Sequence, residues 1–201
     1  PEVAPLIARC VNEKKTLIAT YTEDALTLAD CVVVDVQCDY HKETLGNCRQ
    51  GYADIKALED SLKIIGEKIP KDCLVLIETT VPPGTTEYIA YPILKKAFDR
   101  RFSTPSNKKV TKNPLPIASG PEPLLSHSYE RVMPGREYVA SIRDFWRVCS
   151  GINEESRKRV AKFLSEVLNV EKYPLTVLDR PVESETCKIV ENSYRATILA
   201  F

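Results

Sequence analysis

Short apolar runs alternate with amphipathic stretches from residue 16 to residue 180, and this alternation limits the possible folds more than any other feature. Residues 31–36 (CVVVDV) and 72–79 (DCLVLIET) are nearly continuous apolar runs, typical of strands buried on both faces of a parallel sheet. Apolar residues recur at helical spacing in residues 55–68, 86–101 and 154–168. Strands separated by helices predict an α/β fold with a doubly wound parallel sheet.

Weaker local patterns predict further elements. Short strands are expected at residues 16–22, 116–119, 145–149 and 175–177. Residues 103–116 are polar and rich in proline, which predicts an excursion away from the sheet. From residue 183 onward a helical pattern continues to the end of the chain without Gly or Pro.

Composition excludes several classes of protein. The chain has 28 Lys and Arg against 28 Asp and Glu, a balance that argues against a general nucleic-acid binder. Its apolar runs are far shorter than the ~20 residues of a membrane span. The seven cysteines form no CxxC pair and no Cys/His cluster, so we expect no metal site, and reduced thiols indicate a cytoplasmic protein. Because the chain lacks an initiator Met and ends within a helical pattern, we expect it to be part of a longer protein.

Polar segments follow both buried runs. Residues 36–40 (VQCDY) contain Gln37 and Cys38, and residues 78–86 (ETTVPPGTT) contain Thr80. Open α/β sheets bind ligands at the carboxyl ends of their strands, so these side chains are candidates for a binding site. Taken alone, the second segment is more simply explained as a βα turn with a helix cap.

A third segment, residues 128–135 (SYERVMPG), contains a candidate general base. The neighbouring Arg131 would keep the Glu130 carboxylate ionised, which suits a group that accepts protons. Spacing alone favours the simpler interpretation that both are loop charges in water. The sequence therefore makes Glu130 a candidate without deciding its role.

On the last predicted helix, Glu185, Lys188 and Asn192 lie within about 60° of one another. This spacing fits a solvated i, i+3 ion pair between the first two. It equally fits an amine and an amide presented from a rigid helix into a cleft.

Together these segments resemble the UDP-glucose/GDP-mannose dehydrogenase family, the NAD-dependent nucleotide-sugar 6-dehydrogenases. The resemblance rests on residues 29–40, 79–86, 128–135 and 185–196 (ETCKIVENSYRA), in that order. The Glu-Arg-Val-Met-Pro-Gly loop is most similar to the branch acting on UDP-N-acetylhexosamines. The resemblance implies NAD as cofactor, a nucleotide sugar as substrate, and a homodimer formed through the central helix, with no nucleic-acid or membrane partner. It divides the chain into the remainder of a Rossmann-like NAD-binding domain, residues 1–180, and the start of the central helical domain, residues 181–201.

The resemblance also implies site roles. Lys188 and Asn192 match residues that stabilise a developing oxyanion, Glu130 matches a carboxylate that moves protons, and Thr80 matches a threonine near the nicotinamide. The cofactor residues are Gln37, Cys38 and Thr80, and the substrate residues are Arg131, Val132, Lys188 and Asn192. Cys38 stands where a threonine is usual, and Tyr129 stands where a proline is usual.

Other interpretations stay open. The chain contains no GxGxxG segment and no glycine-rich loop bearing a nucleophilic cysteine, and Cys187 does not match the catalytic position. A catalytically inactive Rossmann-like binding or dimerisation module is therefore the main alternative. A 2-hydroxy-acid or 6-phosphogluconate-type dehydrogenase shares the general plan, but the Glu-Arg-Val-Met-Pro-Gly loop argues against it. We expect the chain alone to oxidise no UDP-sugar.

Overall fold

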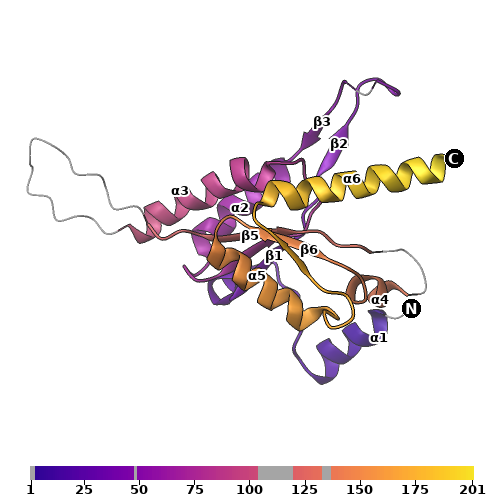
Figure 1. Ribbon diagram of the computed structural model, residues 1–201. Coiled ribbons are helices and arrows are strands. Elements are labelled where there is room, and N and C mark those ends of the chain that lie inside the picture. The colour runs from indigo at the N-terminus through magenta and orange to yellow at the C-terminus, as the bar shows by residue number, and fades with distance from the viewer. Residues whose placement is uncertain (1–2, 48, 104–119, 133–136) are drawn as a thin grey trace, which may run out of the picture.

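The computed structural model describes residues 3–47, 49–103, 120–132 and 137–201 around a five-stranded sheet of order β1-β4-β5-β6-β7 (Figure 1). Its strands are β1 (Cys31–Val34), β4 (Leu74–Ile77), β5 (Leu124–Ser128), β6 (Val148–Gly151) and β7 (Thr176–Leu178). The pairs β1–β4, β4–β5 and β6–β7 are parallel, which confirms the predicted α/β fold with a mostly parallel sheet. One pair of strands departs from the parallel arrangement, since β5 and β6 pair antiparallel. The link between them starts and ends at the same edge of the sheet.

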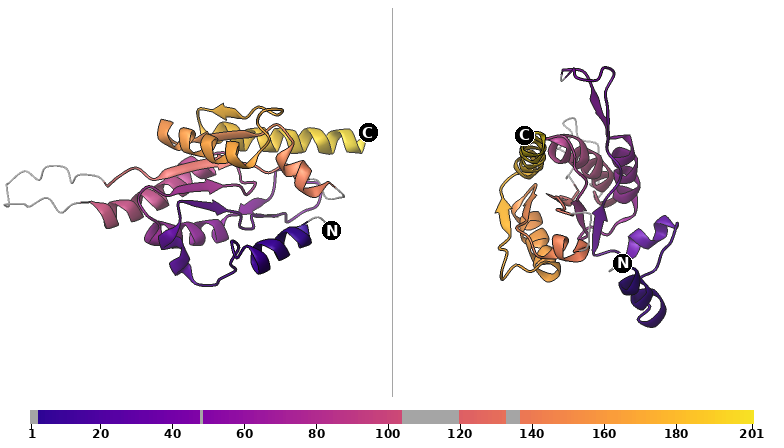
Figure 2. Two further views of the ribbon diagram at one scale, coloured as in Figure 1. Left: turned by 90° about the horizontal axis from the view of Figure 1, so that it is seen from below. Right: turned by 90° about the vertical axis from the view of Figure 1, so that its right-hand side faces the viewer.

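Helices cover both faces of this sheet (Figure 2). One face carries α2 (Lys56–Lys68), η3 (Thr86–Ala90), α3 (Tyr91–Phe102) and α6 (Pro181–Ala200), and the other carries α5 (Glu154–Val167). Helix η3 is a π-type turn that continues directly into α3, so the predicted helix at 86–101 forms with a wider first turn. Helix α6 begins at Pro181, two residues before the predicted position.

The side chains of β4 alternate between two apolar cores, one on each face of the sheet. Val75 and Ile77 pack with the α2 and α3 side chains, whereas Leu74 and Leu76 pack against α5. All four are at most 1% exposed, which confirms the predicted burial on both faces. The same prediction is wrong for β1, where Val33 is 44% exposed because β1 lies at the edge of the sheet.

Two short strands were placed within a few residues of their observed positions, since 145–149 corresponds to β6 and 175–177 to β7. Residues 16–22 do not form the predicted strand. They are exposed and pair with no strand in the described part of the chain, and a strand requires a hydrogen-bonded neighbour. The predicted strand at 116–119 lies outside the described residues, and sequence reasoning did not predict β5.

The remaining elements lie outside the main sheet. They are α1 (Val3–Ala8), η1 (Arg9–Glu13), η2 (Glu23–Leu28), α4 (Tyr138–Arg143), β2 (Asp39–His41) and β3 (Tyr52–Asp54). Strands β2 and β3 form an antiparallel pair that projects from the body of the molecule (Figure 1). Within residues 3–47, 49–103, 120–132 and 137–201, no helix combines the length and apolarity that crossing a bilayer requires.

Candidate functional site

The carboxyl ends of β1, β4 and β5 meet at one edge of the sheet. Val34 is paired with Ile77, and Ile77 with His127, so the segments that follow these strands start side by side. These are the segments that contain Cys38, Thr80 and Glu130. Polar side chains at the carboxyl edge of a largely parallel sheet form the usual ligand-binding position of such folds.

Lys188 of α6 reaches this edge and is nearly buried. Its Nζ donates to the backbone carbonyl of Glu130 at 2.9 Å and lies 3.8 Å from Glu130 Oε1. It also lies 5.3 Å from the centre of the Tyr129 ring. Burial lowers the pKa of the Lys188 ammonium below its ordinary value, while Glu130 and Glu191 oppose that change. Of the two alternatives that the spacing left open, an ion pair between Glu185 and Lys188 on a solvated face is not observed, because both side chains are buried and each has other partners.

The Glu130 carboxylate is held by a backbone group of its own loop, the loop after β5. The backbone N–H of Val132 donates to Glu130 Oε2, which fixes the carboxylate over the turn. Arg131 points elsewhere: it pairs with Glu191 of α6 at 2.9 Å and stacks on the Phe145 ring at 4.0 Å. Burial raises the pKa of Tyr129 to about 12, so its hydroxyl stays protonated. Residues 133–135 of the motif lie outside the described residues.

Asn192 lies one helical turn beyond Lys188 and is exposed. The structure therefore places the predicted amide on the same side of α6, beyond the buried part of the helix. In the same turn, Glu191 bridges two guanidinium groups, Arg131 at 2.9 Å and Arg195 at 3.2 Å. Sequence reasoning did not identify this bridge.

Thr79 connects the segments after β1 and β4. The sequence singled out the adjacent Thr80 and not Thr79. The Thr79 hydroxyl donates to the carbonyl of Val36 at 2.8 Å, which leaves the half-buried Thr80 as the next residue along the edge. Gln37 is exposed, and its amide donates to both carboxylate oxygens of Asp39 at 2.8 Å. Burial raises the pKa of the Cys38 thiol, with Asp39 and Asp54 adding to the effect, so this thiol is protonated at neutral pH.

A buried ion pair beneath this edge was also missed. Arg147 donates to Glu78 at 3.1 Å and to the carbonyl of Tyr129, and so connects the ends of β4 and β5 to the segment before β6. Burial raises the pKa of Glu78, and Arg147 opposes the change. A charged residue directly after a buried run was the available signal for Glu78, but nothing in the sequence pointed to Arg147.

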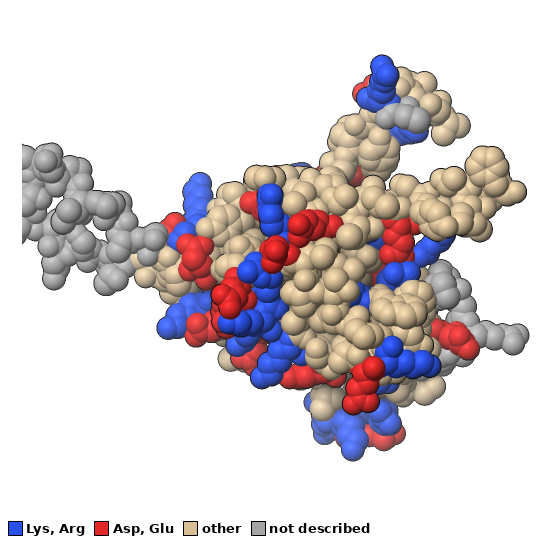
Figure 3. All heavy atoms as spheres, in the orientation of Figure 1, with Lys and Arg blue, Asp and Glu red and all other residues tan. Residues whose placement is uncertain are grey.

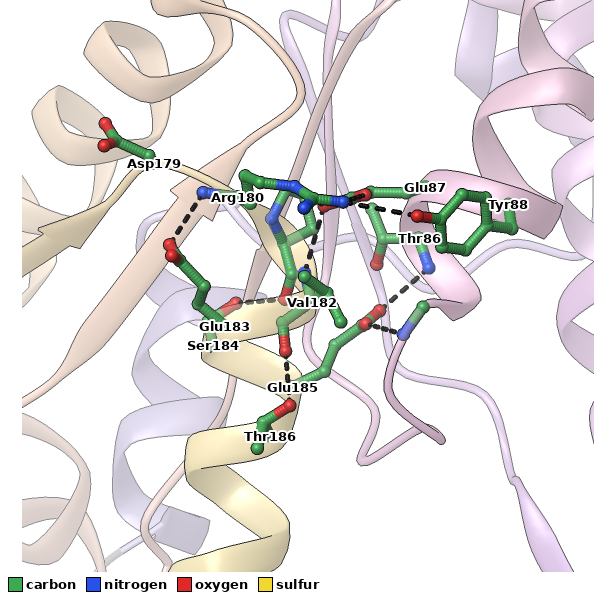
Figure 4. Close-up of polar contacts among 12 residues, drawn as sticks. Thr86, Glu87, Tyr88, Asp179, Arg180, Val182, Glu183, Ser184, Glu185 and Thr186 are labelled. Carbon is green, nitrogen blue, oxygen red and sulfur yellow. Dashed lines mark hydrogen bonds and ion pairs between the residues drawn. The ribbon is translucent and has the colours of Figure 1, made fainter.

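The first turns of α6 are fixed by buried polar contacts. The Glu185 carboxylate accepts N–H groups of Gly84 and Thr86 at 2.5 and 2.8 Å (Figure 4). One residue earlier, Ser184 contacts His127 Nδ1 at 2.7 Å and Ser150 Oγ at 2.6 Å. Burial lowers the pKa of His127 to about 3, so this imidazole is neutral.

A mostly parallel α/β sheet with polar loops at its carboxyl edge defines a dinucleotide-binding domain of the Rossmann type. The chain belongs to the UDP-glucose/GDP-mannose dehydrogenase family, because residues 1–141 match the model of that family's NAD binding domain. The resemblance inferred from the sequence is thereby confirmed.

Individual relatives agree with this family. The chain is 32% identical over 155 residues to a UDP-glucose 6-dehydrogenase of Rickettsia conorii, covering 75% of this chain and 29% of that protein. It is 25% identical over 147 residues to a UDP-N-acetyl-D-mannosamine dehydrogenase of Pyrococcus horikoshii, covering 73% and 30%. A solved NDP-N-acetyl-D-galactosaminuronic acid dehydrogenase from Methanosarcina mazei superposes with a TM-score of 0.74 at 28% identity, covering 97% of this chain and 35% of that one. The chain thus spans 29–35% of the length of these proteins.

NAD is the cofactor of this family's domain. The Gln37 amide and the Thr80 hydroxyl can both donate and accept hydrogen bonds, as ribose hydroxyls and a carboxamide require. Both lie at or near the protein surface beside the strand ends. The protonated Cys38 thiol offers only a weak donor at the third position.

Proposed function

We propose that the protein to which this chain belongs is an NAD-dependent nucleotide-sugar 6-dehydrogenase. It oxidises the C6 alcohol of a UDP-sugar to the uronate in two hydride transfers. The observation that carries the proposal is the nearly buried Lys188 ammonium, held against Glu130 at the carboxyl edge of a family NAD-binding domain. A fixed positive charge at this position suits a reaction in which charge develops on oxygen.

The side chains divide the work between charge and proton transfer. Lys188 uses one N–H on the Glu130 carbonyl, and its other N–H groups are available to the substrate oxygen. Glu130, whose side chain is 40% exposed, accepts the alcohol proton and activates water. Asn192 adds an amide N–H to the same oxygen, and Thr80 orients the alcohol beside the cofactor. When bound, NAD supplies the hydride acceptor.

The proposed substrate is a UDP-N-acetylhexosamine. The Glu130-Arg131-Val132 segment supports this choice, and the likeness to the Methanosarcina and Pyrococcus enzymes of N-acetylated sugars adds to it. Arg131 and Val132 contribute to the sugar site. Because the Rickettsia relative acts on UDP-glucose, that sugar is the competing substrate in the test.

Residues 1–180 form the remainder of the NAD-binding domain, and α6 starts a central helix through which two cytoplasmic copies associate. Support comes from the outer part of α6, which projects from the body with a mostly uncharged surface (Figure 3). Tyr194, Ile198 and Leu199 there are more than half exposed. The same surface would favour the alternative of a catalytically inactive dimerisation module.

An NADH assay on the intact protein separates these functions. UDP-N-acetylglucosamine, UDP-N-acetylmannosamine and UDP-glucose are each offered with NAD, and NADH and uronate are both measured. We expect the highest kcat/KM with an N-acetylated sugar and two NADH for each uronate formed. No NADH from any sugar would favour the inactive module, and preference for UDP-glucose would overturn the substrate assignment.

A further inference from the structure

Glu185 is a fully buried carboxylate at the start of a helix distant in sequence. It is 0% exposed, and its two oxygens accept the N–H groups of Gly84 and Thr86, residues 101 and 99 positions earlier (Figure 4). Gly84 lies in the turn after β4, and Thr86 is the first residue of the helix formed by η3 and α3. A side chain of α6 therefore satisfies backbone groups that a local cap would ordinarily satisfy.

The local sequence supplies no such cap. Thr85 is the residue at the N-cap position, but its side chain makes no capping bond. Its hydroxyl instead donates to the carbonyl of Pro82 at 2.6 Å. The positive end of a helix attracts an anion, and here the Glu185 carboxylate occupies that place. A phosphate group of a ligand is thereby excluded from this helix terminus.

The same turn of α6 also reaches the next loop. Glu185 contacts the loop after β4, and Lys188, three residues later, contacts the loop after β5 through Glu130. One turn of α6 therefore contacts both the segment after β4, which contains Thr80, and the loop after β5. We propose that Glu185 is a positioning residue, which holds the 80–86 turn and the Lys188 ammonium in register with each other. The effect on catalysis rests on the proposed function, whereas the effect on geometry does not.

A second carboxylate, whose side chain is 15% exposed, joins the same two helices through an exposed arginine and serves as a matched control. Glu87 of η3 pairs with Arg180 at the start of α6 at 2.6 Å, and the Arg180 side chain is 57% exposed. Glu87 also accepts the N–H of Val182 at 3.3 Å. If any contact between η3 and α6 were sufficient to hold the 80–86 turn and Lys188 in register, removing Glu87 would disturb them as much as removing Glu185.

The test compares Glu185→Gln with Glu87→Gln. In the chain itself, amide hydrogen exchange at Gly84 and Thr86 and the pKa of Lys188 are measured by NMR. In the intact enzyme, kcat and KM are measured. We expect Glu185→Gln to speed exchange at both amides about tenfold or more, to raise the pKa of Lys188 toward its ordinary value, and to lower kcat about tenfold with a nearly unchanged KM. Glu87→Gln should leave both exchange rates, kcat and KM within about twofold of wild type and the pKa of Lys188 unchanged.

Glu185→Asp covers the case in which Glu185→Gln does not fold, because the shorter acid can still reach one N–H group. It should restore protection at one amide only and give an intermediate kcat. Wild-type exchange and an unchanged Lys188 pKa in both Glu185 variants would overturn the proposal, and so would equal effects from Glu87→Gln. If the intact protein oxidises no sugar, exchange and the Lys188 pKa still decide the positioning role.

Discussion

The inner half of α6 buries polar side chains, and its outer half exposes apolar ones. Along residues 181–188 the buried side chains include Ser184, Glu185 and Lys188, and each has a hydrogen-bond partner on another element. Along residues 189–200 the large apolar side chains are exposed, with Leu199 at 80%. This is the reverse of the usual preference for apolar side chains inside and polar ones outside.

The contrast indicates what each half does. Burying a polar group costs free energy unless the group is hydrogen-bonded. The concentration of buried polar groups in the inner half therefore indicates a functional site. Exposed apolar groups on one helix are typical of a surface that another polypeptide covers. The predictions that follow separate the two halves, from the largest expected effect to the smallest.

The largest expected effect is a loss of folding stability in acid, which arises at His127, the partner of Ser184 in the inner half of α6. Burial lowers the pKa of His127 from 6.5 to about 3 in the folded protein, so below pH 6.5 the unfolded chain binds the additional proton. Stability should therefore fall as the pH drops from 6.5, by about 4–5 kcal/mol at pH 3 from this group alone. Denaturant unfolding of wild type and His127→Gln across this range measures the difference in slope.

Removing the hydroxyl at the centre of the same network should have the next largest effect. Ser184→Ala leaves His127 Nδ1 and Ser150 Oγ without their common partner, which costs about 1–3 kcal/mol of unfolding free energy. Ser193→Ala, in the exposed half of α6, should change it by less than about 0.5 kcal/mol. Equal losses from the two serine variants would contradict the distinction between the halves.

The surface ion pair at the start of α6 should contribute little. Glu87→Gln removes the partner of Arg180, and exposed ion pairs of this kind stabilise proteins by about 0–1 kcal/mol. Chemical denaturation at low and high salt measures the loss. A cost of several kcal/mol that persists in high salt would show that this contact, and not only Glu185, seats the helix.

Substitutions in the outer half of α6 should have little effect on the stability of the monomer. Leu199→Ser should alter the unfolding free energy of the monomer by less than about 0.5 kcal/mol. If two copies associate through this surface, the same substitution should weaken that association, which sedimentation velocity of the intact protein measures. A dimer that is indifferent to Leu199→Ser would exclude this part of α6 from the interface.

Sequence patterns predicted those parts of the fold that apolar periodicity determines. β4, α2 and α5 have regular apolar spacing and formed close to their predicted positions. β5 escaped prediction because Ser126, His127 and Ser128 look like a polar loop. They are fully buried in the middle of the sheet, where they form hydrogen bonds with Ser156, Ser184 and the carbonyl of Val148. No local pattern can reveal partners that lie 20 to 57 residues away.

The site was predictable only in part for the same reason. Family resemblance identified Lys188 and Glu130, and the fold places them in contact. Glu185 fitted a solvated ion pair with Lys188 as one of two open alternatives, because i, i+3 spacing on a helix does not reveal the surroundings. Its actual partners are backbone N–H groups, which have no sequence signature.

The central claim is that the Lys188 ammonium stabilises the developing oxyanion. Steady-state kinetics of Lys188→Ala in the intact enzyme tests it most directly, with Lys158→Ala, at an exposed lysine of α5, as the control. We expect kcat to fall about 10²–10³-fold for Lys188→Ala, with NAD affinity preserved and the control unchanged. Turnover of Lys188→Ala near that of wild type would contradict the account.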